Sequence, residues 1–239
     1  MNTILIIAGR ELKSFFDSLI AYVMIILFLG FSGFFTWLFG SDVFLLGQAN
    51  LNSFFSIAYW TLFFFIPALS MRLIAEEKRS GTLEMILTKP VSDPQFIFGK
   101  YIATLCLIVI ALLFTLPYYI TLSQIGEVDH GAIISGYFGL ILLSSAYISI
   151  GIFASSLTNN QIVAFLLALF IGLFFHLIFG TLASAFTGKL AEILNDLDMA
   201  YHFASIRRGV IDSRDLVFFL SITLLGLYLS VVILSKRKK

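Results

Sequence analysis

Charged residues gather most densely in residues 72–100, RLIAEEKRSGTLEMILTKPVSDPQFIFGK, between two long apolar stretches. Acids and bases stand here at helical spacing, Gly81 breaks the helix, and a short amphipathic turn follows. Asp93 and Pro94 then indicate the cap and first position of a new helix, because proline loses no needed hydrogen bond there. A short charged segment held between two apolar helices is a place where a partner protein can bind and push.

A simpler interpretation of this block is a solvated loop that sets the topology of the chain through positive charge. Setting the topology of the chain, however, requires only basic residues. The block also contains the acidic pair Glu76 and Glu77, a glycine and a second, capped turn. We therefore favour an interaction surface over a passive loop.

Residues 30–33 spell Gly-Phe-Ser-Gly, the GxSG pattern of intramembrane serine proteases, and His176 lies in a later apolar run. A catalytic dyad would need the Ser32 hydroxyl within hydrogen-bond reach of that imidazole, in a pocket that admits water. Phe31 and Phe34 give the serine no polar support, and closely spaced glycines in a membrane helix usually serve packing. We expect Ser32 to be a packing residue and His176 a polar residue with a partner, not a catalyst.

A phosphate-binding loop for nucleotide is absent from the sequence. Around Gly99 and Lys100, Pro94 stands where the first glycine of GxxxxGK[ST] would be, and Tyr101 stands in place of the hydroxyl residue. With the single Cys106 and three scattered histidines, a metal site has no support either. We therefore predict no catalytic residue, metal or cofactor in this chain.

The composition places the chain in a membrane. Of its 239 residues, 59% are hydrophobic and 12% are charged, which is outside the range of soluble domains. A net charge of +1 does not suggest a nucleic-acid partner. The chain is expected to be a polytopic membrane protein.

Apolar runs of about 20 residues can cross a bilayer as helices. Six such runs lie near residues 19–39, 54–73, 95–122, 132–157, 161–186 and 216–234. Helices are expected because unpaired backbone groups are too costly in lipid, and the alternation of a membrane barrel is absent. Pro67 and Pro117 lie near the ends of two runs, where they are expected to kink the helices. Without tandem repeats or low-complexity linkers, residues 1–239 should form one all-α integral membrane domain.

Two segments flank these runs as amphipathic helices. In residues 2–17, polar side chains lie on one helical face, opposite Ile4, Ala8, Leu12 and Phe15, as in an elbow helix lying in the membrane interface. Residues 187–215 are mixed in charge, with apolar residues at helical spacing, and are expected to form an external amphipathic cap before the last span. His130 and His202 fall in external segments and are expected to be solvated.

The distribution of lysine and arginine predicts the orientation. With a cytoplasmic N-terminus, eleven of the fifteen bases lie inside. The four that face outward are Lys189, Arg207, Arg208 and Arg214. Six spans then return the C-terminus to the cytoplasm, and residues 72–100 are cytoplasmic as well.

Three stretches resemble ABC-2 type permeases, the membrane subunits of a large class of ATP-driven transporters. Residues 10–23, RELKSFFDSLIAYV, followed by LFLGFSGFF, look like the start of these proteins, and AEEKRSGTLEMILTKPVSDPQFIFGK is similar to their signature between spans two and three. The closing RRGVIDSRDLVFFLS, residues 207–221, resembles the gliding-motility-associated branch in particular. Leu19 departs from the pattern, because related sequences often have a proline after the serine, and this affects the geometry of the elbow.

The resemblance implies a dimeric permease of the bacterial inner membrane, with both termini cytoplasmic, that docks a separate ATPase. Docking would use a coupling helix in the first cytoplasmic loop, residues 76–84 of the coupling segment 74–93. The expected contacts are Glu76, Glu77, Arg79, Gly81, Thr82 and Glu84. The expected secondary contacts on the elbow are Arg10, Lys13 and Asp17.

The same resemblance implies a set of partners. ATP and Mg²⁺ belong to a dimer of ABC ATP-binding subunits, and this chain holds no cofactor. The second membrane subunit is identical or related, membrane lipid surrounds both, and participation of an auxiliary extracytoplasmic protein stays open. The predicted function is to couple ATP hydrolysis in the partner to translocation of a cargo across the membrane. The alternative is a non-transporting anchor or mechanical transmitter, in which the ATPase pulls on an external partner through residues 187–215.

The residues of the spans indicate only a broad class of cargo. They hold no acidic or basic residue that clearly marks an ion or proton path in mid-membrane, which disfavours a channel or secondary transporter. An ATP-driven device for lipid, glycan, peptide or hydrophobic cargo suits them better. In the fourth run, small residues recur at the spacing of closely packed helices, with a hydroxyl-lined cavity as the alternative: Ser144, Ser145, Ser149, Gly151 and Ser155.

Overall fold

The computed structural model describes residues 3–39, 49–83 and 91–236. The described part is helical throughout, apart from short connections, and contains no strand. Its helices are α1 (Thr3–Asp17), α2 (Ile20–Trp37), α4 (Asn52–Ser70), α5 (Arg72–Arg79), α7 (Asp93–Leu113), α8 (Leu116–Ile125), α9 (His130–Leu157), α10 (Gln161–Leu173), the π-helix η1 (Phe174–Ile178), α11 (Phe179–Ala185), α12 (Lys189–Asn195), α13 (Met199–Arg207) and α14 (Ser213–Lys236).

Within the described residues, six helical segments are long and apolar enough to cross a membrane. They are Ile20–Trp37, Asn52–Arg79, Asp93–Ile125, His130–Leu157, Gln161–Ala185 and Ser213–Lys236. Each coincides with one of the six predicted runs, so the predicted all-helical, six-span fold is confirmed. The bounds differ by a few residues, most of all where the second span continues into α5.

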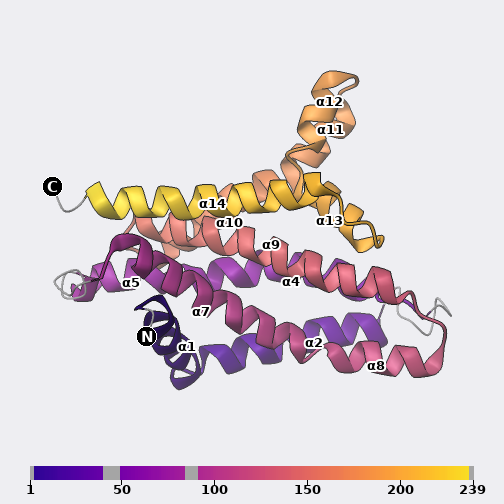
Figure 1. Ribbon diagram of the computed structural model, residues 1–239, viewed down its shortest axis with the longest axis horizontal. Coiled ribbons are helices and arrows are strands. Elements are labelled where there is room, and N and C mark those ends of the chain that lie inside the picture. The colour runs from indigo at the N-terminus through magenta and orange to yellow at the C-terminus, as the bar shows by residue number, and fades with distance from the viewer. Residues whose placement is uncertain (1–2, 40–48, 84–90, 237–239) are drawn as a thin grey trace.

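The long helices lie side by side, and α9 occupies the middle of the bundle (Figure 1). It packs against α4, α7, α10, α13 and α14. Two of these contacts are close: a Cβ at Gly151 would lie 1.8 Å from Ser70 Oγ on α4, and one at Gly226 of α14 would lie 2.7 Å from Ser149 Oγ. The small residues of α9 therefore serve tight helix packing, as predicted.

The hydroxyl groups along α9 are buried in these helix contacts. Ser145 Oγ lies 2.6 Å from Tyr101 Oη of α7 and 2.9 Å from Thr223 Oγ1 of α14. Ser149 Oγ donates to the Ala146 carbonyl of its own helix at 2.8 Å. Because these hydroxyls bond to neighbouring helices or to their own, they stabilise the packing, and the alternative of a hydroxyl-lined cavity is not supported at these positions.

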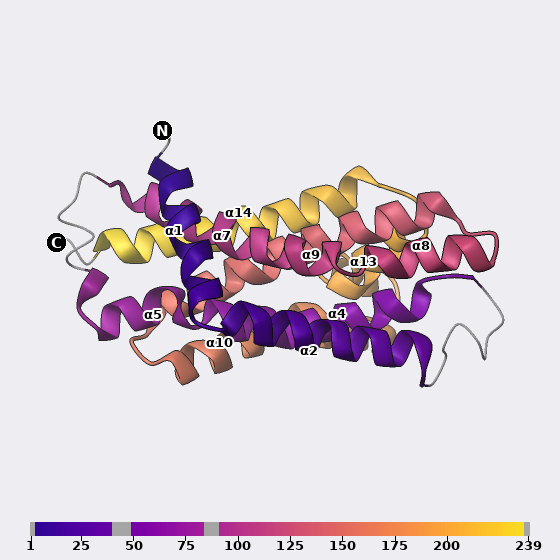
Figure 2. The ribbon, with the colours of Figure 1, turned by 90° about the horizontal axis from the view of Figure 1, so that it is seen from below.

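The start of α1 and the end of α14 lie at the same end of the bundle, together with α5 and the start of α7 (Figures 1 and 2). We call this the terminal end, and we call the opposite one, where α8 ends and α9 begins, the far end. The helix α1 crosses the bundle axis instead of continuing α2 (Figure 2). Leu19 forms the corner between them with a left-handed backbone, φ 59°, which a residue with a Cβ rarely adopts. The predicted elbow is thus observed as a helix, with Ala8 and Phe15 buried on its apolar face.

Two spans are interrupted. The third breaks at residues 114–115, between α7 and α8, and Pro117 stands in the first turn of α8, so the expected kink is confirmed there. The helix α4 instead runs through Pro67 to Ser70. The fifth span contains η1, which the sequence did not predict; within it, the carbonyl of His176 accepts a hydrogen bond from Tyr59 Oη of α4 at 3.0 Å.

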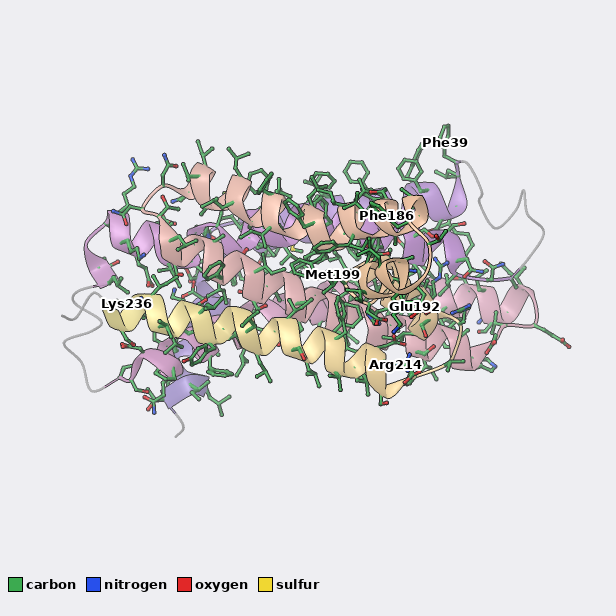
Figure 3. All side chains as sticks on the ribbon, turned by 90° about the horizontal axis from the view of Figure 1, so that it is seen from above. Phe39, Phe186, Glu192, Met199, Arg214 and Lys236 are labelled. Carbon is green, nitrogen blue, oxygen red and sulfur yellow. The ribbon has the colours of Figure 1, made fainter. Side chains whose placement is uncertain are left out.

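The last helix of the fifth span, α11, and the following helix, α12, stand out sideways from the bundle (Figure 1). In Figure 3, seen from above, this projection is viewed nearly end on, near the labelled Glu192. No side chain of α12 is buried in the described structure, and Leu190 and Ile193 are exposed. The next helix, α13, returns to the bundle and packs against α9. The predicted amphipathic segment is therefore two short helices with different surroundings.

Two sequence predictions in the connecting segments were wrong. The cap of α7 is Ser92, not Asp93: its Oγ accepts from Gln95 N–H, and Gln95 Oε1 accepts from Ser92 N–H, a reciprocal capping box. His202 is not solvated but only 3% exposed, because its ring packs against Phe218 of α14 and its Nδ1 lies 2.7 Å from Asp215 Oδ1. His130, by contrast, is exposed as expected.

Candidate functional site at the terminal end of the bundle

The helix α5 carries the predicted contact residues and is tied to α9 by an unusual cap. Two backbone N–H groups in its first turn, those of Ile74 and Ala75, donate to Ser155 Oγ of α9 at 3.1 and 2.9 Å. The same hydroxyl donates to the carbonyl of Met71 at 2.8 Å. A hydroxyl from another helix thus replaces the local cap that this helix start lacks, so α5 and the end of α9 are held together.

The side chains of α5 divide it into an inner and an outer face. Leu73, Ile74 and Ala75 are buried, whereas Glu76 and Arg79 are exposed. This division explains why a segment with so many charges is ordered, since its apolar stripe packs on the bundle while its polar stripe stays outside. A base near its end also contributes, because Lys78 Nζ donates to the carbonyl of Ser156 on α9.

A buried lysine joins three helices at this end. Lys100 of α7 is 1% exposed, and its Nζ donates to Glu77 Oε1 of α5 at 2.8 Å and to Glu11 Oε2 of α1 at 3.1 Å. The ammonium also lies 5.1 Å from the ring centre of Phe96. A buried ammonium is costly unless it is paired, so these two carboxylates are what permits Lys100 to stay inside. We call Glu11, Glu77 and Lys100 the charge triad.

The charge triad gives Glu77 a structural role. This residue was expected on the docking surface, but its carboxylate turns inward to Lys100, and its second oxygen, Oε2, is buried without a hydrogen-bond partner. Glu77 therefore holds α5 against α7 and is only partly accessible. The sequence showed an acidic pair, but it could not show that Glu76 points outward and Glu77 inward, because Lys100 is 23 residues away in the chain.

The remaining predicted contacts lie on the outside. Glu76, Arg79, Gly81 and Thr82 are exposed, and Glu84 lies outside the described residues. Gly81 follows the end of α5 with φ 72°, a conformation that a residue with a Cβ adopts only under strain. The predicted helix break is therefore confirmed at this glycine. Ser80 Oγ donates to the Glu76 carbonyl at 2.9 Å and supports the same turn.

The elbow contributes a second exposed charged strip at the same end. Arg10, Lys13 and Asp17 are all exposed on α1, while Glu11 between them reaches inward to Lys100. A further link ties the elbow to α5: the guanidinium of Arg72 lies 5.5 Å from the ring centre of Phe15 and donates to Ser18 Oγ at 3.3 Å. The structure thus joins the two strips through shared partners.

The C-terminal end of α14 completes the arrangement. At the terminal end, Ser235 Oγ of α14 donates to Asp93 Oδ2 at the start of α7 at 3.0 Å, and Asp93 is buried. The helices α1, α5, α7 and α14 therefore meet in one polar layer. A force applied to the outer face of α5 has direct hydrogen-bonded routes to α1, α7 and α9.

The protease interpretation has no geometric support. Ser32 Oγ donates to the carbonyl of Leu29 in its own helix at 3.4 Å. The imidazole of His176 lies between the rings of Tyr59 and Phe63, at 4.1 and 4.2 Å, and its Nδ1 is 2.6 Å from Tyr147 Oη. Serine and histidine thus have separate partners, and His176 is the partnered packing residue that was expected.

A metal-binding cluster is not found either. Among residues 3–39, 49–83 and 91–236, no group of three or more His, Cys, Asp or Glu side chains is arranged to hold a metal ion. The pairing of His202 with Asp215 instead joins α13 to α14, and His202 Nε2 donates to the carbonyl of Asp196 at 3.0 Å. The sequence signal for this pair was weak, since the two residues are separated by a loop.

Comparison with protein families places these features in a known context. The family model described as "ABC-2 family transporter protein" matches residues 5–237, nearly the whole chain. A search of curated proteins gave no match.

Proposed function

Because the chain belongs to the ABC-2 family of transporter proteins, we propose that it is the permease subunit of an ABC transporter and couples ATP hydrolysis in a partner to movement of a cargo across the membrane. The partner would supply the nucleotide site with ATP and Mg²⁺. The chain itself contributes the multi-pass membrane part.

The observation that carries this proposal is the fixed position of α5. Its outer face, with Glu76 and Arg79, is exposed, while its inner face is bonded to α9 through Ser155 and to α7 through Lys100. A partner that pushes on this face therefore moves packed transmembrane helices instead of a loose loop. The exposed strip of α1, with Arg10, Lys13 and Asp17, would widen the docking surface.

The orientation is part of the proposal. With the terminal end in the cytoplasm of a bacterial inner membrane, α5 and α1 face an ATPase dimer, and α12 and α13 lie on the outside. The excess of lysine and arginine at the terminal end supports this orientation. The protein would work with a second membrane subunit, identical or related. The likeness of residues 207–221 to the gliding-motility-associated branch supports placing the chain near that branch, and the neighbouring genes would test this.

A second function is favoured by one specific feature, the projection of α11 and α12 from the bundle (Figure 1). An exposed helix such as α12, with Leu190 and Ile193 on its surface, could hold an extracytoplasmic partner. The chain would then be an anchor that transmits force without moving a cargo. Purified complexes in liposomes would separate the two functions, since both hydrolyse ATP and only the transporter moves a cargo.

The docking surface is tested by reversing its charges. The chain is co-expressed with the ABC ATPase of the nearest neighbouring gene, and the amount of ATPase that co-purifies is measured for Glu76→Lys/Arg79→Glu. A single exposed pair is worth only about 0 to 1 kcal/mol, so both changes are made together. The matched control is Lys189→Glu/Glu192→Lys, an exposed base and acid at the same spacing on α12. Loss of capture only in the α5 variant is expected; equal capture by both variants would place docking elsewhere.

A further inference from the structure

A groove of about 190 Å³ lies between α4 and α13, toward the far end of the bundle. The first turns of α4 supply Ser56, Tyr59 and Trp60 to its lining, and α13 supplies Phe203 and Arg207. Nothing in the permease function proposed above uses this groove. Its lining combines one cation with three aromatic rings.

The cation, Arg207, has few protein partners. Its Nη1 donates to Ser56 Oγ at 2.9 Å, and no carboxylate lies within ion-pair distance of it among the residues that the structure describes. Partial burial lowers the pKa of Arg207, but an arginine stays charged at any physiological pH. A guanidinium offers five N–H donors in a planar fork, which matches the oxygens of a phosphate.

The aromatic part of the groove lies deeper in the bundle than the cation. Tyr59 and Phe203 stack at 5.5 Å between ring centres and form the floor, and Trp60 is 45% exposed at the side. Along α4, Trp60 follows Ser56 by four residues, a rise of roughly 6 Å toward the middle of the span. The charge therefore stands near the membrane surface and the apolar wall below it.

A second hollow of about 270 Å³ adjoins the cationic end. Arg207 lines it too, together with Arg208, Asn50 and Asp129. The carboxylate of Asp129 caps α9 there by accepting from Ala132 N–H at 3.0 Å. Atoms beyond a phosphate held at Arg207 would thus meet polar side chains.

We propose that this groove binds a membrane phospholipid, with its phosphate on the guanidinium of Arg207 and the upper part of an acyl chain along Trp60. The order of groups in the groove, polar hollow, cation and then aromatic wall, is the order of headgroup, phosphate and chain in such a lipid. One of the two helices that form it, α4, belongs to a candidate span, and the other, α13, precedes the last one, so the groove is placed where membrane lipid surrounds the chain. The assignment does not depend on the ATPase partner.

The test measures lipid retained by the purified full-length chain. The protein is delipidated in detergent, incubated with dioleoyl phosphatidylglycerol or with dioleoylglycerol, which lacks the phosphate, and analysed by native mass spectrometry. Arg207→Gln is compared with Arg214→Gln, an exposed arginine in the first turn of α14 and outside the groove. Trp60→Ala is compared with Phe64→Ala, an exposed ring one turn farther along α4.

We expect Arg207→Gln to lower retention of phosphatidylglycerol at least about tenfold, because hydrogen bonds to a charged group are lost. Trp60→Ala should lower it about threefold, and both controls should match the original chain. Dioleoylglycerol should bind weakly to every variant. Equal retention by Arg207→Gln and Arg214→Gln, or equal retention of the two lipids, would overturn the proposal.

Two further outcomes are also decisive. Displacement of the lipid by millimolar inorganic phosphate would identify a site for free phosphate and overturn the lipid assignment. If Arg207→Gln does not elute as a single folded species, Trp60→Ala decides, because an exposed side chain can be removed without harming the fold. Retention by Trp60→Ala equal to that of Phe64→Ala would then count against the groove.

Discussion

Lys100 Nζ lies 2.8 Å from Glu77 Oε1, so a lysine of α7 that is only 1% exposed holds the inner face of α5. Glu76, the neighbour of Glu77, points outward. One acidic residue therefore serves the fold while the adjacent one remains available to a partner. This arrangement lets α5 transmit movement to α7, because the two helices are joined by charge as well as by packing.

The charge triad should be essential as a unit. Replacing Lys100 with Met leaves Glu11 and Glu77 without their cation in a largely buried place, and breaking a buried pair in this way costs about 3 to 5 kcal/mol. We expect a clear fall in the melting temperature of the purified protein in detergent. The exposed Lys189→Met is the control. Because an apolar replacement of a whole buried ion cluster is often tolerated, Lys100→Met/Glu77→Leu/Glu11→Leu should recover most of the loss. A stable Lys100→Met would contradict the structural role.

Packing between α9 and α4 should not tolerate a single added methyl group. In Gly151→Ala, the new Cβ would lie 1.8 Å from Ser70 Oγ and 2.6 Å from Ser70 Cβ, so the helices must separate. Overpacking of this kind costs about 1 to 3 kcal/mol. Gly30→Ala is the matched control, since nothing lies within 4 Å of its added Cβ. Membrane abundance and melting temperature should fall for the first variant alone, and equal behaviour of the two would refute the close crossing.

The transporter and protease interpretations predict opposite results at neighbouring positions. Ser32→Ala should leave function nearly intact, because the hydroxyl bonds only to its own helix. Gly33→Leu should impair assembly, because even a Cβ there lies 2.8 Å from Tyr118 Oη of α8. Complementation of a deletion strain, with membrane abundance matched, is the measurement. If Ser32 were a nucleophile, Ser32→Ala would assemble normally and lose several powers of ten in rate.

The orientation can be tested by labelling. In a Cys106→Ala background, single cysteines at Ser80, Asp129 and Asn195 are treated on intact cells with a membrane-impermeant maleimide. We expect labelling at 129 and 195, at the far end and on the projection, and none at 80, beside α5. A cysteine in place of Asn50 should be labelled in the same way as the cysteine at position 129. Labelling at 80 but not at 129 would reverse the proposed topology.

The cap of α13 should make stability depend on pH. Burial raises the pKa of Asp198 above its ordinary 3.8, although its carboxylate accepts from Ala200 and Tyr201 N–H. An acid whose pKa is raised in the folded state lowers the free energy of unfolding as pH rises from its ordinary pKa to its folded pKa. The full loss is reached above the folded pKa. Asn caps helices as well as Asp does. Asp198→Asn should therefore gain melting temperature relative to the original chain between pH 4 and 7, whereas Asp198→Ala loses the cap, which is worth about 0.5 to 2 kcal/mol. A constant difference between Asn and Asp across this range would contradict the pKa direction.

The six spans, the elbow and the helix break at Gly81 were predictable from the sequence, because each depends on local physics. Span length is set by the thickness of the bilayer, an apolar stripe needs only helical periodicity, and a left-handed turn selects glycine. Even here the local signal placed the cap of α7 at Asp93, one residue too late. Ser92 and Asp93 are both polar residues that can cap a helix, and in the structure Ser92 does so, in a reciprocal pair with Gln95.

The inward or outward direction of each charged side chain was decided only by the tertiary structure. Glu77 turns to a lysine of α7, and Glu11 reaches the same lysine from 89 residues away. His202 is buried because α14 brings Asp215 and Phe218 against it. The cost of burying a charge depends on which partner the crossing of two helices supplies, and a one-dimensional pattern contains no record of that crossing.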